Sequence, residues 1–225
     1  MIKHYLKVAF RNLMKYKTQS LVSIIGLAVG FTCFALSVLW IHYEMTYDNF
    51  HKGSDRIYMV RAHYANEPGT SKFTPYPLMK YLQDKMPEIE ATASTSIYRD
   101  MKFRMGDNEQ EVVMATADSV FMNFFNIRLL KGTVNFLKEN DPEIAITEEF
   151  ARKLFGSEED ALGKEVELSG RPRKIGAIVS GWSRHSNIPY SVLSSARRYP
   201  RWSSKGEQLF IRVRAGVDRD TFQKK

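Results

Sequence analysis

The longest uninterrupted run of apolar side chains lies close to the N-terminus. Residues 21–41 read LVSIIGLAVGFTCFALSVLWI and contain no formally charged side chain. As a helix that rises about 1.5 Å per residue, this run is about 31 Å long, close to the thickness of a bilayer's hydrocarbon core. A cleaved signal peptide usually has a shorter apolar region followed by small residues, whereas this run leads into the interfacial residues WIHY at 40–43. The pattern predicts a retained transmembrane helix over residues 20–43.

The segment before this run has apolar and basic side chains at helical spacing. Between residues 2 and 17 the apolar side chains fall on one side of a helix, and basic side chains recur on the other. The basic residues of this membrane-interface segment are Lys3, Lys7, Arg11, Lys15 and Lys17. Residues 1–19 are therefore expected to form an amphipathic helix at the cytoplasmic surface of the bilayer. A plain helical extension of the span is the alternative.

The charges that flank the apolar run predict its orientation. No carboxylate precedes the run, whereas Glu44 and Asp48 follow it. Loops rich in Lys and Arg stay preferentially on the cytoplasmic side of a membrane. The N-terminus is therefore expected in the cytoplasm, and residues 44–225 outside it.

Residues 44–225 contain short helix and strand patterns in irregular order. Strands are predicted at 56–64, 92–105, 110–116, 164–168, 173–180 and 208–214, and helices at 75–86 and 147–155. Asp118 and Thr147 are expected to cap the N-termini of a short helix and of the helix at 147–155. Because strands and helices do not alternate regularly, as they would in a doubly wound sheet, the pattern predicts an α+β extracytoplasmic domain after the two N-terminal helices.

The formal net charge of +8 raises the question of nucleic-acid binding. Residues 43–225 carry 28 basic and 25 acidic residues, so only +3 resides there. A domain outside the membrane does not meet chromosomal DNA, and nucleic acid is not an expected partner. Positive charge is concentrated in residues 171–225, which carry 13 basic and 3 acidic residues. The segment ARRYPRWSSK at 196–205 is interpreted as a solvated loop, with contact to anionic headgroups or to an acidic partner as alternatives.

The sequence lacks the common motifs of enzymes and metal sites. Neither of the phosphate-binding patterns GxxxxGK[ST] and GxGxxG occurs, and GxSxG and HExxH are also missing. The only cysteine, Cys33, lies inside the apolar run, so an intrachain disulfide is impossible. We therefore expect a non-catalytic protein with no bound cofactor and no metal.

The stretch EMTYDNFHKGSDRIYMVR at 44–61 has the greatest chemical variety. Asp48, His51 and Asp55 are three and four residues apart, a spacing that would align them on one helical face as metal ligands or an acid–base set. The Lys-Gly-Ser sequence at 52–54 interrupts such a helix. We interpret the stretch instead as the junction between span and domain. The junction residues are Tyr47, Asp48, Phe50, His51, Asp55 and Arg56.

Several segments, in this order, resemble the FtsX-like/MacB-like permease family of ABC transporters. They are FRNL at 10–13, KTQS at 17–20, Glu44 with YDNFH at 47–51 and DRIY at 55–58, ADSVF at 117–121, LLKG at 129–132, ITEEFARKLFG at 146–156 and ALGK at 161–164. The resemblance covers nearly the whole chain, although the segment 184–193 matches only loosely. Family members carry further membrane helices after this domain, commonly three. The chain is therefore expected to be a truncated permease or a one-span relative.

The resemblance implies a periplasmic core domain attached to the bacterial inner membrane. The implied function is that of a permease subunit, which couples ATP hydrolysis by a separate cytoplasmic ABC ATPase to motion of the periplasmic domain for efflux, export or lipoprotein-type extrusion. The implied partners are that ATPase, a second permease in a homo- or heterodimer, a periplasmic adaptor protein and the lipid bilayer. The alternative is a single-span, membrane-anchored periplasmic sensor or binding domain without transport activity.

Overall fold

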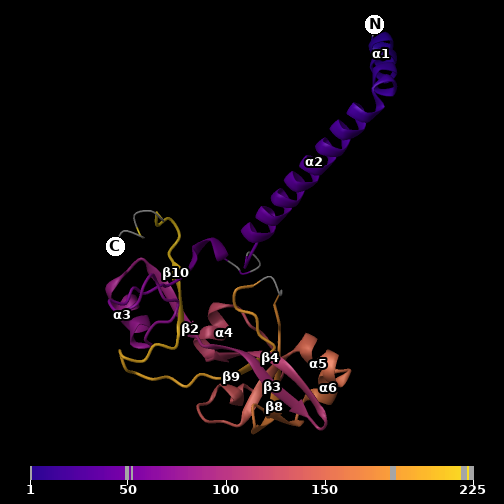
Figure 1. The fold of residues 1–225 in the computed structure, drawn as a ribbon. Helices are drawn as coiled ribbons and strands as arrows, with labels where there is room; N and C mark the ends of the chain where they lie inside the picture. Colours follow the sequence, from indigo (N-terminus) through magenta and orange to yellow (C-terminus); the bar gives the residue numbers. More distant parts are fainter. Residues whose placement is uncertain (1, 49–50, 52, 183–185, 219–221, 223–225) are drawn as a thin grey trace. The chain divides into compact units, whose positions relative to one another are not determined.

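The computed structural model describes residues 2–48, 51, 53–182, 186–218 and 222 (Figure 1). The chain divides into two compact units, Met1–Tyr47 and Asp48–Lys225, which we call the N-terminal unit and the C-terminal unit. Each is described by itself. The predicted domain limits at 19/20 and 43/44 stay predictions.

The N-terminal unit consists of two helices, α1 (Ile2–Lys15) and α2 (Lys17–Met45). The backbone of Tyr16, with φ −111° and ψ 55°, leaves the helical region between them. α2 is long and apolar enough to cross a membrane by length and composition. None of its residues is buried by other parts of the chain, as expected for a helix whose solvent is lipid.

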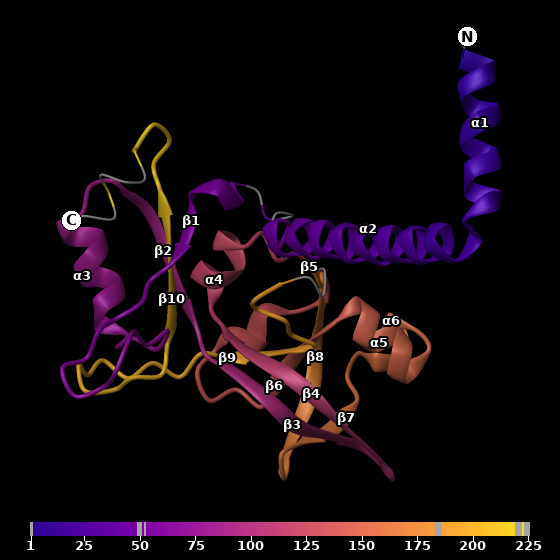
Figure 2. The same ribbon diagram turned by 45° about the horizontal axis from the view of Figure 1, so that its top comes forward.

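A three-stranded antiparallel sheet forms one part of the C-terminal unit. Its strand order is β1 (Ile57–Met59), β10 (Gln208–Val213) and β2 (Ile89–Thr95). The helix α3 (Pro77–Lys85) lies beside this sheet (Figure 2). Ile89, Ile211 and Val213 are buried there against partly buried side chains that include Leu82 of α3.

A seven-stranded sheet forms the larger part. Its strands, in spatial order, are β5 (Leu129–Gly132), β8 (Arg171–Val179), β6 (Glu143–Thr147), β9 (Val192–Ser195), β4 (Asn108–Ala117), β3 (Ile97–Met105) and β7 (Glu165–Leu168). β7 pairs with both β3 and β8, so the sheet closes on itself and leaves few unpaired edges.

Alternate residues of the central strands pack into two different cores, as the period of two in a strand requires. Ile144 and Ile146 of β6 pack in one core with α5 (Glu148–Phe155) and α6 (Glu158–Ala161). Ala145 of β6 faces the other core, to which the helix α4 (Ser119–Phe124) contributes Phe121 and Phe124. Phe210 of β10 belongs to that same core, so α4 joins the two sheets.

The strand predicted at 92–105 is wrong in one respect, because the chain crosses there from one sheet to the other. β2 ends at Thr95 and β3 begins at Ile97. Between them the N–H group of Ser96 donates to Oγ1 of Thr116 at 2.8 Å, and its hydroxyl donates to the carbonyl of Gly206 at 2.9 Å. The N–H group of Ser96 thus binds a side chain, whereas its carbonyl still accepts from the backbone N–H of Thr116 at 3.0 Å. Sequence periodicity does not show such a change of sheet.

The other predicted elements agree with the structure in kind, but their limits differ. The strand predicted at 56–64 is reduced to β1, preceded by a 3-10 turn at Ser54–Arg56. The short strands β5, β6 and β9 were missed. Asp118 and Thr147 are confirmed as N-caps, since their side chains accept from the N–H groups of Phe121 at 2.7 Å and Phe150 at 3.3 Å. The mixed content of strands and helices confirms the α+β class.

Candidate functional site

Asp48, the first residue of the C-terminal unit, binds a loop far away in the sequence. Its Oδ1 accepts a hydrogen bond from the hydroxyl of Ser186 at 2.5 Å. The backbone N–H of Asn187 lies 3.2 Å from both carboxylate oxygens, and the side-chain amide of Asn187 donates to Oδ2 at 2.8 Å. The backbone of Asp48 has φ 57°, a left-handed conformation that Asp and Asn adopt more readily than most residues. The carboxylate therefore fixes the start of the unit to residues 186–187.

His51 lies among aromatic rings of the same unit. Its ring centroid is 4.7 Å from that of Trp182, edge-on, and 5.0 Å from that of Phe125. Only 8% of the residue is exposed. Burial lowers the pKa of His51, and the nearby Asp48 carboxylate opposes this only in part. The histidine thus behaves as a neutral, packed ring at neutral pH.

Two further aromatic residues connect this region to the core. Trp182 donates from Nε1 to the carbonyl of Ile188 at 2.9 Å, and its ring meets that of Tyr190 edge-on at 4.6 Å. Tyr190 donates to the carbonyl of Ser180 at 2.8 Å, and burial raises its pKa. We call the resulting set the entry cluster: Asp48, His51, Phe125, Trp182, Ser186, Asn187 and Tyr190.

The structure brings together only part of the predicted junction. Asp48 and His51 belong to the entry cluster, whereas Arg56 turns to the three-stranded sheet. There Arg56 forms an ion pair with Glu90 at 2.7 Å and donates to the carbonyl of Val213 at 3.0 Å. The role of the junction in coupling remains a prediction.

The remaining junction residues lie elsewhere. Asp55 is exposed in the 3-10 turn. Tyr47 belongs to the N-terminal unit, where its ring meets that of Tyr43 edge-on at 5.9 Å. Phe50 lies outside the described residues. Within the described part of the chain, no group of three or more His, Cys, Asp or Glu side chains is placed to hold a metal ion.

Sequence analysis missed the partners of the junction. Trp182, Ser186 and Asn187 come from a segment of the chain more than 130 residues after Asp48. A Ser-Asn pair in a loop is common, and neither spacing nor periodicity links it to a distant carboxylate. Only the fold of the seven-stranded sheet brings the two segments together.

The predicted basic residues of the membrane interface lie on the N-terminal unit. Lys7, Arg11 and Lys15 of α1 and Lys17 of α2 have exposed side chains. The side chain of Lys3 lies outside the described part. Their contact with a bilayer or with a partner remains a prediction.

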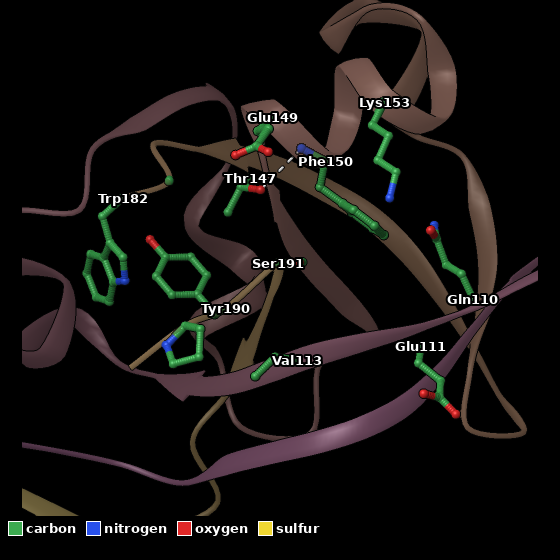
Figure 3. A pocket seen from close by; sticks show the side chains of 12 residues that line it. Gln110, Glu111, Val113, Thr147, Glu149, Phe150, Lys153, Trp182, Tyr190 and Ser191 are labelled. Atoms are coloured by element: carbon green, nitrogen blue, oxygen red, sulfur yellow. Dashed lines mark hydrogen bonds between the residues drawn. The ribbon is translucent and has the colours of Figure 1, made fainter. Parts of the chain in front are cut away.

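A cavity of about 230 Å³ adjoins the entry cluster (Figure 3). Trp182 and Tyr190 line it on one side, and Gln110 and Lys153 on the other. Glu149 at the start of α5 adds a carboxylate. Apolar rings and both signs of charge thus surround one small space, and two of its walls are the rings that belong to the entry cluster.

Arg198 holds the basic segment 196–205 against the unit. The guanidinium forms ion pairs with Asp118 at 2.5 Å and Glu207 at 3.3 Å, and it also donates to the hydroxyl of Ser94. It lies over the ring of Tyr76, 4.7 Å from the ring centroid. The side chain is only 15% exposed. At this residue the segment is therefore partly buried and held by ion pairs, unlike the solvated loop that the sequence suggested.

Three solved structures illustrate the similarity of this fold to known proteins. A domain of a putative permease from Porphyromonas gingivalis is similar with a TM-score of 0.63 and 23% identity, over 77% of this chain and 82% of that chain. The extracellular domain of the noncanonic ABC-type transporter YknZ from Gram-positive bacteria is similar with a TM-score of 0.52 and 12% identity, over 75% of this chain and 86% of that chain. The periplasmic region of MacB from Actinobacillus actinomycetemcomitans is similar with a TM-score of 0.52 and 13% identity, over 76% of this chain and 80% of that chain. At these identities the similarity shows the fold.

The fold is therefore one that, in two of these three proteins, belongs to a region described as extracellular or periplasmic. More specifically, the family of the MacB-like periplasmic core domain matches residues 20–225, and the chain belongs to this family. None of the curated proteins matches the chain significantly. The family resemblance inferred from the sequence is thus confirmed. With the candidate span α2, the family indicates a membrane-anchored protein with an extracytoplasmic domain.

Proposed function

We propose that the chain is the permease subunit of a MacB/FtsX-type ABC transporter and transmits motion to its extracytoplasmic unit. ATP is hydrolysed by a separate cytoplasmic ATPase, and the chain itself has no catalytic residues. The N-terminus lies in the cytoplasm of a bacterial cell, α2 crosses the inner membrane, and two permeases form a homo- or heterodimer. The moving unit drives efflux, export or extrusion of a lipoprotein-type substrate.

The observation that carries this proposal is the anchoring of Asp48. Only Thr46 and Tyr47 separate the last residue of α2, Met45, from Asp48. Three Cα–Cα steps span at most about 11 Å, so displacement of the helix beyond this reach pulls on Asp48. The carboxylate is in turn bound to residues 186–187 and adjoins the packed rings of the entry cluster. A flexible linker would dissipate such motion, whereas an anchored one transmits it.

The test is a measurement of coupling in the full chain, reconstituted with its ATPase partner. Asp48→Ala removes the acceptor of Ser186 and Asn187. We expect substrate transport to fall at least tenfold while binding of the ATPase and of ATP stays unchanged. Asp55→Ala is the matched control, because Asp55 is an exposed carboxylate seven residues away. Equal transport by both variants would contradict the anchoring role.

The same experiment examines the basic residues of α1. Replacing Lys7, Arg11 and Lys15 together with Gln keeps the helix but removes its exposed charge. If these residues meet the membrane surface or the ATPase, ATP hydrolysis by the complex loses its dependence on the permease. Unchanged stimulation of the ATPase would remove α1 from the coupling route.

The cavity beside the entry cluster favours a second candidate, a membrane-anchored sensor or binding domain without transport activity. Its lining combines Trp182 and Tyr190 with the charged residues Glu149 and Lys153. Ligand binding there would change the fluorescence of Trp182. A chain that binds a small ligand but neither associates with an ATPase nor supports transport would favour this candidate over the permease.

A further inference from the structure

The basic segment 196–205 exposes aromatic rings beside arginine side chains. Trp202 is 58% exposed, and its ring meets that of Tyr81 of α3 edge-on at 6.0 Å. Tyr199 is 49% exposed, and the guanidinium of Arg197 lies over its ring at 5.5 Å. We call this set the aromatic–arginine surface: Tyr81, Tyr98, Arg197, Tyr199, Arg201 and Trp202.

Three of these residues line one hollow of the C-terminal unit. Tyr98, Arg197 and Tyr199 line a single hollow of about 120 Å³ together with Gly206 and Glu207. The N–H of Arg201 donates to the carbonyl of Tyr199 at 2.7 Å, which folds the segment back on itself. Only Pro200 and Arg201 separate Tyr199, which lines the hollow, from Trp202 of the Tyr81–Trp202 pair.

We propose that the aromatic–arginine surface binds an extracytoplasmic protein through an acidic segment of that protein. Single exposed aromatic residues are ordinary on protein surfaces. Tyr, Trp and Arg clustered around a hollow are instead the composition of the energetic centres of protein–protein interfaces. Two rings of the surface, Tyr98 and Tyr199, line the hollow together with Arg197.

The charge of the surface determines the chemistry of the partner. Residues 168–206 contain no Asp and no Glu. Glu207 borders the hollow, but it is paired with Arg198. Among the described residues, neither Arg197 nor Arg201 forms an ion pair. Two guanidinium groups without counter-charges favour carboxylates on the partner.

A protein fits this surface better than a lipid bilayer does. Clusters that bind anionic lipids usually have four to eight Lys or Arg residues, whereas this surface has two free arginines. The segment is also held in place before binding. Arg198 is clamped by Asp118 and Glu207, and Gly206 accepts from the hydroxyl of Ser96. Such preorganisation reduces the entropy lost on association.

Site-specific photocrosslinking in native membranes tests the proposal. Tyr199→benzoylphenylalanine in the full chain is compared with the same replacement at Val134, an exposed apolar residue of the same unit. We expect position 199 to crosslink an acidic protein at least fivefold more than position 134. The double variant Arg197→Glu with Arg201→Glu should abolish this product, and Arg197→Lys with Arg201→Lys should retain part of it. A product with lipid, with a basic protein or with a second copy of the chain overturns the proposal, as does equal yield at position 134.

A second measurement uses poly-L-glutamate as the probe and the purified full chain in detergent. The Glu double variant should weaken binding at least tenfold, and salt should weaken binding to the wild-type chain. Unchanged binding by the double variant overturns the proposal.

The inference depends on the extracytoplasmic placement proposed above but not on transport. Ser203→Cys in a Cys33→Ala background, labelled in intact cells by an impermeant maleimide, examines that placement separately. If the maleimide does not label Ser203→Cys while position 199 still gives the crosslink, the extracytoplasmic placement is refuted. The binding role of the aromatic–arginine surface is then retained.

Discussion

Two charged residues hold chain segments onto the C-terminal unit, and their surroundings differ in kind. Asp48 is met by neutral donors, namely a hydroxyl, a backbone N–H and an amide. Arg198 is met by two carboxylates, Asp118 and Glu207. Loss of Asp48 leaves neutral groups, and Asn187 is exposed enough for water to replace the carboxylate. Loss of Arg198 leaves two carboxylates without their shared counter-charge. Burial raises the pKa of Glu207, and the charge of Asp118 adds to this. The second contact is therefore expected to contribute more to stability than the first.

The largest effect is expected from Arg198→Ala. Removal of one partner from a buried ion pair costs about 3 kcal/mol at the low end of the usual range, and Arg198 is only 15% exposed. Thermal unfolding of the full chain in detergent should show a midpoint lowered by roughly 10 °C. Arg197→Ala is the matched control, because Arg197 is an exposed neighbour that forms no ion pair among the described residues. Equal midpoints for the two variants would show that Arg198 is not a structural clamp.

Asp48→Ala is expected to have a smaller effect on stability, about 2 kcal/mol, for the hydrogen bonds lost to Ser186 and Asn187. Asp48→Asn keeps one acceptor oxygen and tolerates the left-handed backbone, so it should lose less than half as much. Denaturant unfolding of the same preparation measures both. If Asn is as damaging as Ala, the charge rather than the hydrogen bonds is required.

A still smaller effect is expected from the pH dependence of His51. Burial lowers the pKa of His51 in the folded state below its ordinary value of 6.5. Its contribution to stability is therefore present above pH 6.5 and is lost as the pH falls through the lowered pKa. His51→Phe keeps a ring among Phe125 and Trp182 but cannot titrate. Between pH 6.5 and 5, the unfolding midpoint of the wild type should fall more than that of this variant. Equal falls of the two midpoints would contradict a role of His51 in the pH dependence.

The smallest change is expected for Glu207→Gln. Burial raises the pKa of Glu207 above its ordinary value of 4.5 despite the opposing charge of Arg198. A raised folded-state pKa contributes stability that is present below pH 4.5 and is lost as the pH rises through the folded-state value. The free energy of unfolding of the variant should therefore differ from that of the wild type by less than about 1 kcal/mol at pH 7. Relative to the wild type, the variant should be more stable at pH 7 than at pH 4. Asp118→Asn serves as the comparison, because it removes the other carboxylate paired with Arg198 but retains the cap of α4. A large loss at pH 7 for Glu207→Gln would show that both counter-charges are required.

The local elements were predictable because their causes are local. The uncharged run of α2 and the caps Asp118 and Thr147 each follow from a few adjacent residues. The family resemblance rested on the same kind of short segments, and the match over residues 20–225 confirms it. The short strands β5, β6 and β9 were missed because four or five residues give too little periodicity to distinguish them from loop.

By itself the sequence determined the candidate membrane span, the α+β class and the family, because apolar length, periodicity and capping depend on neighbouring residues. The tertiary structure alone decided that Asp48 binds Ser186 and Asn187, that Ser96 marks a crossing between sheets and that Arg198 is buried. These depend on contacts between residues far apart in the chain, and closure of the seven-stranded sheet brings such residues together. The charge of Arg198 is visible in the sequence, but whether it is solvated or clamped depends on the carboxylates that the fold places beside it.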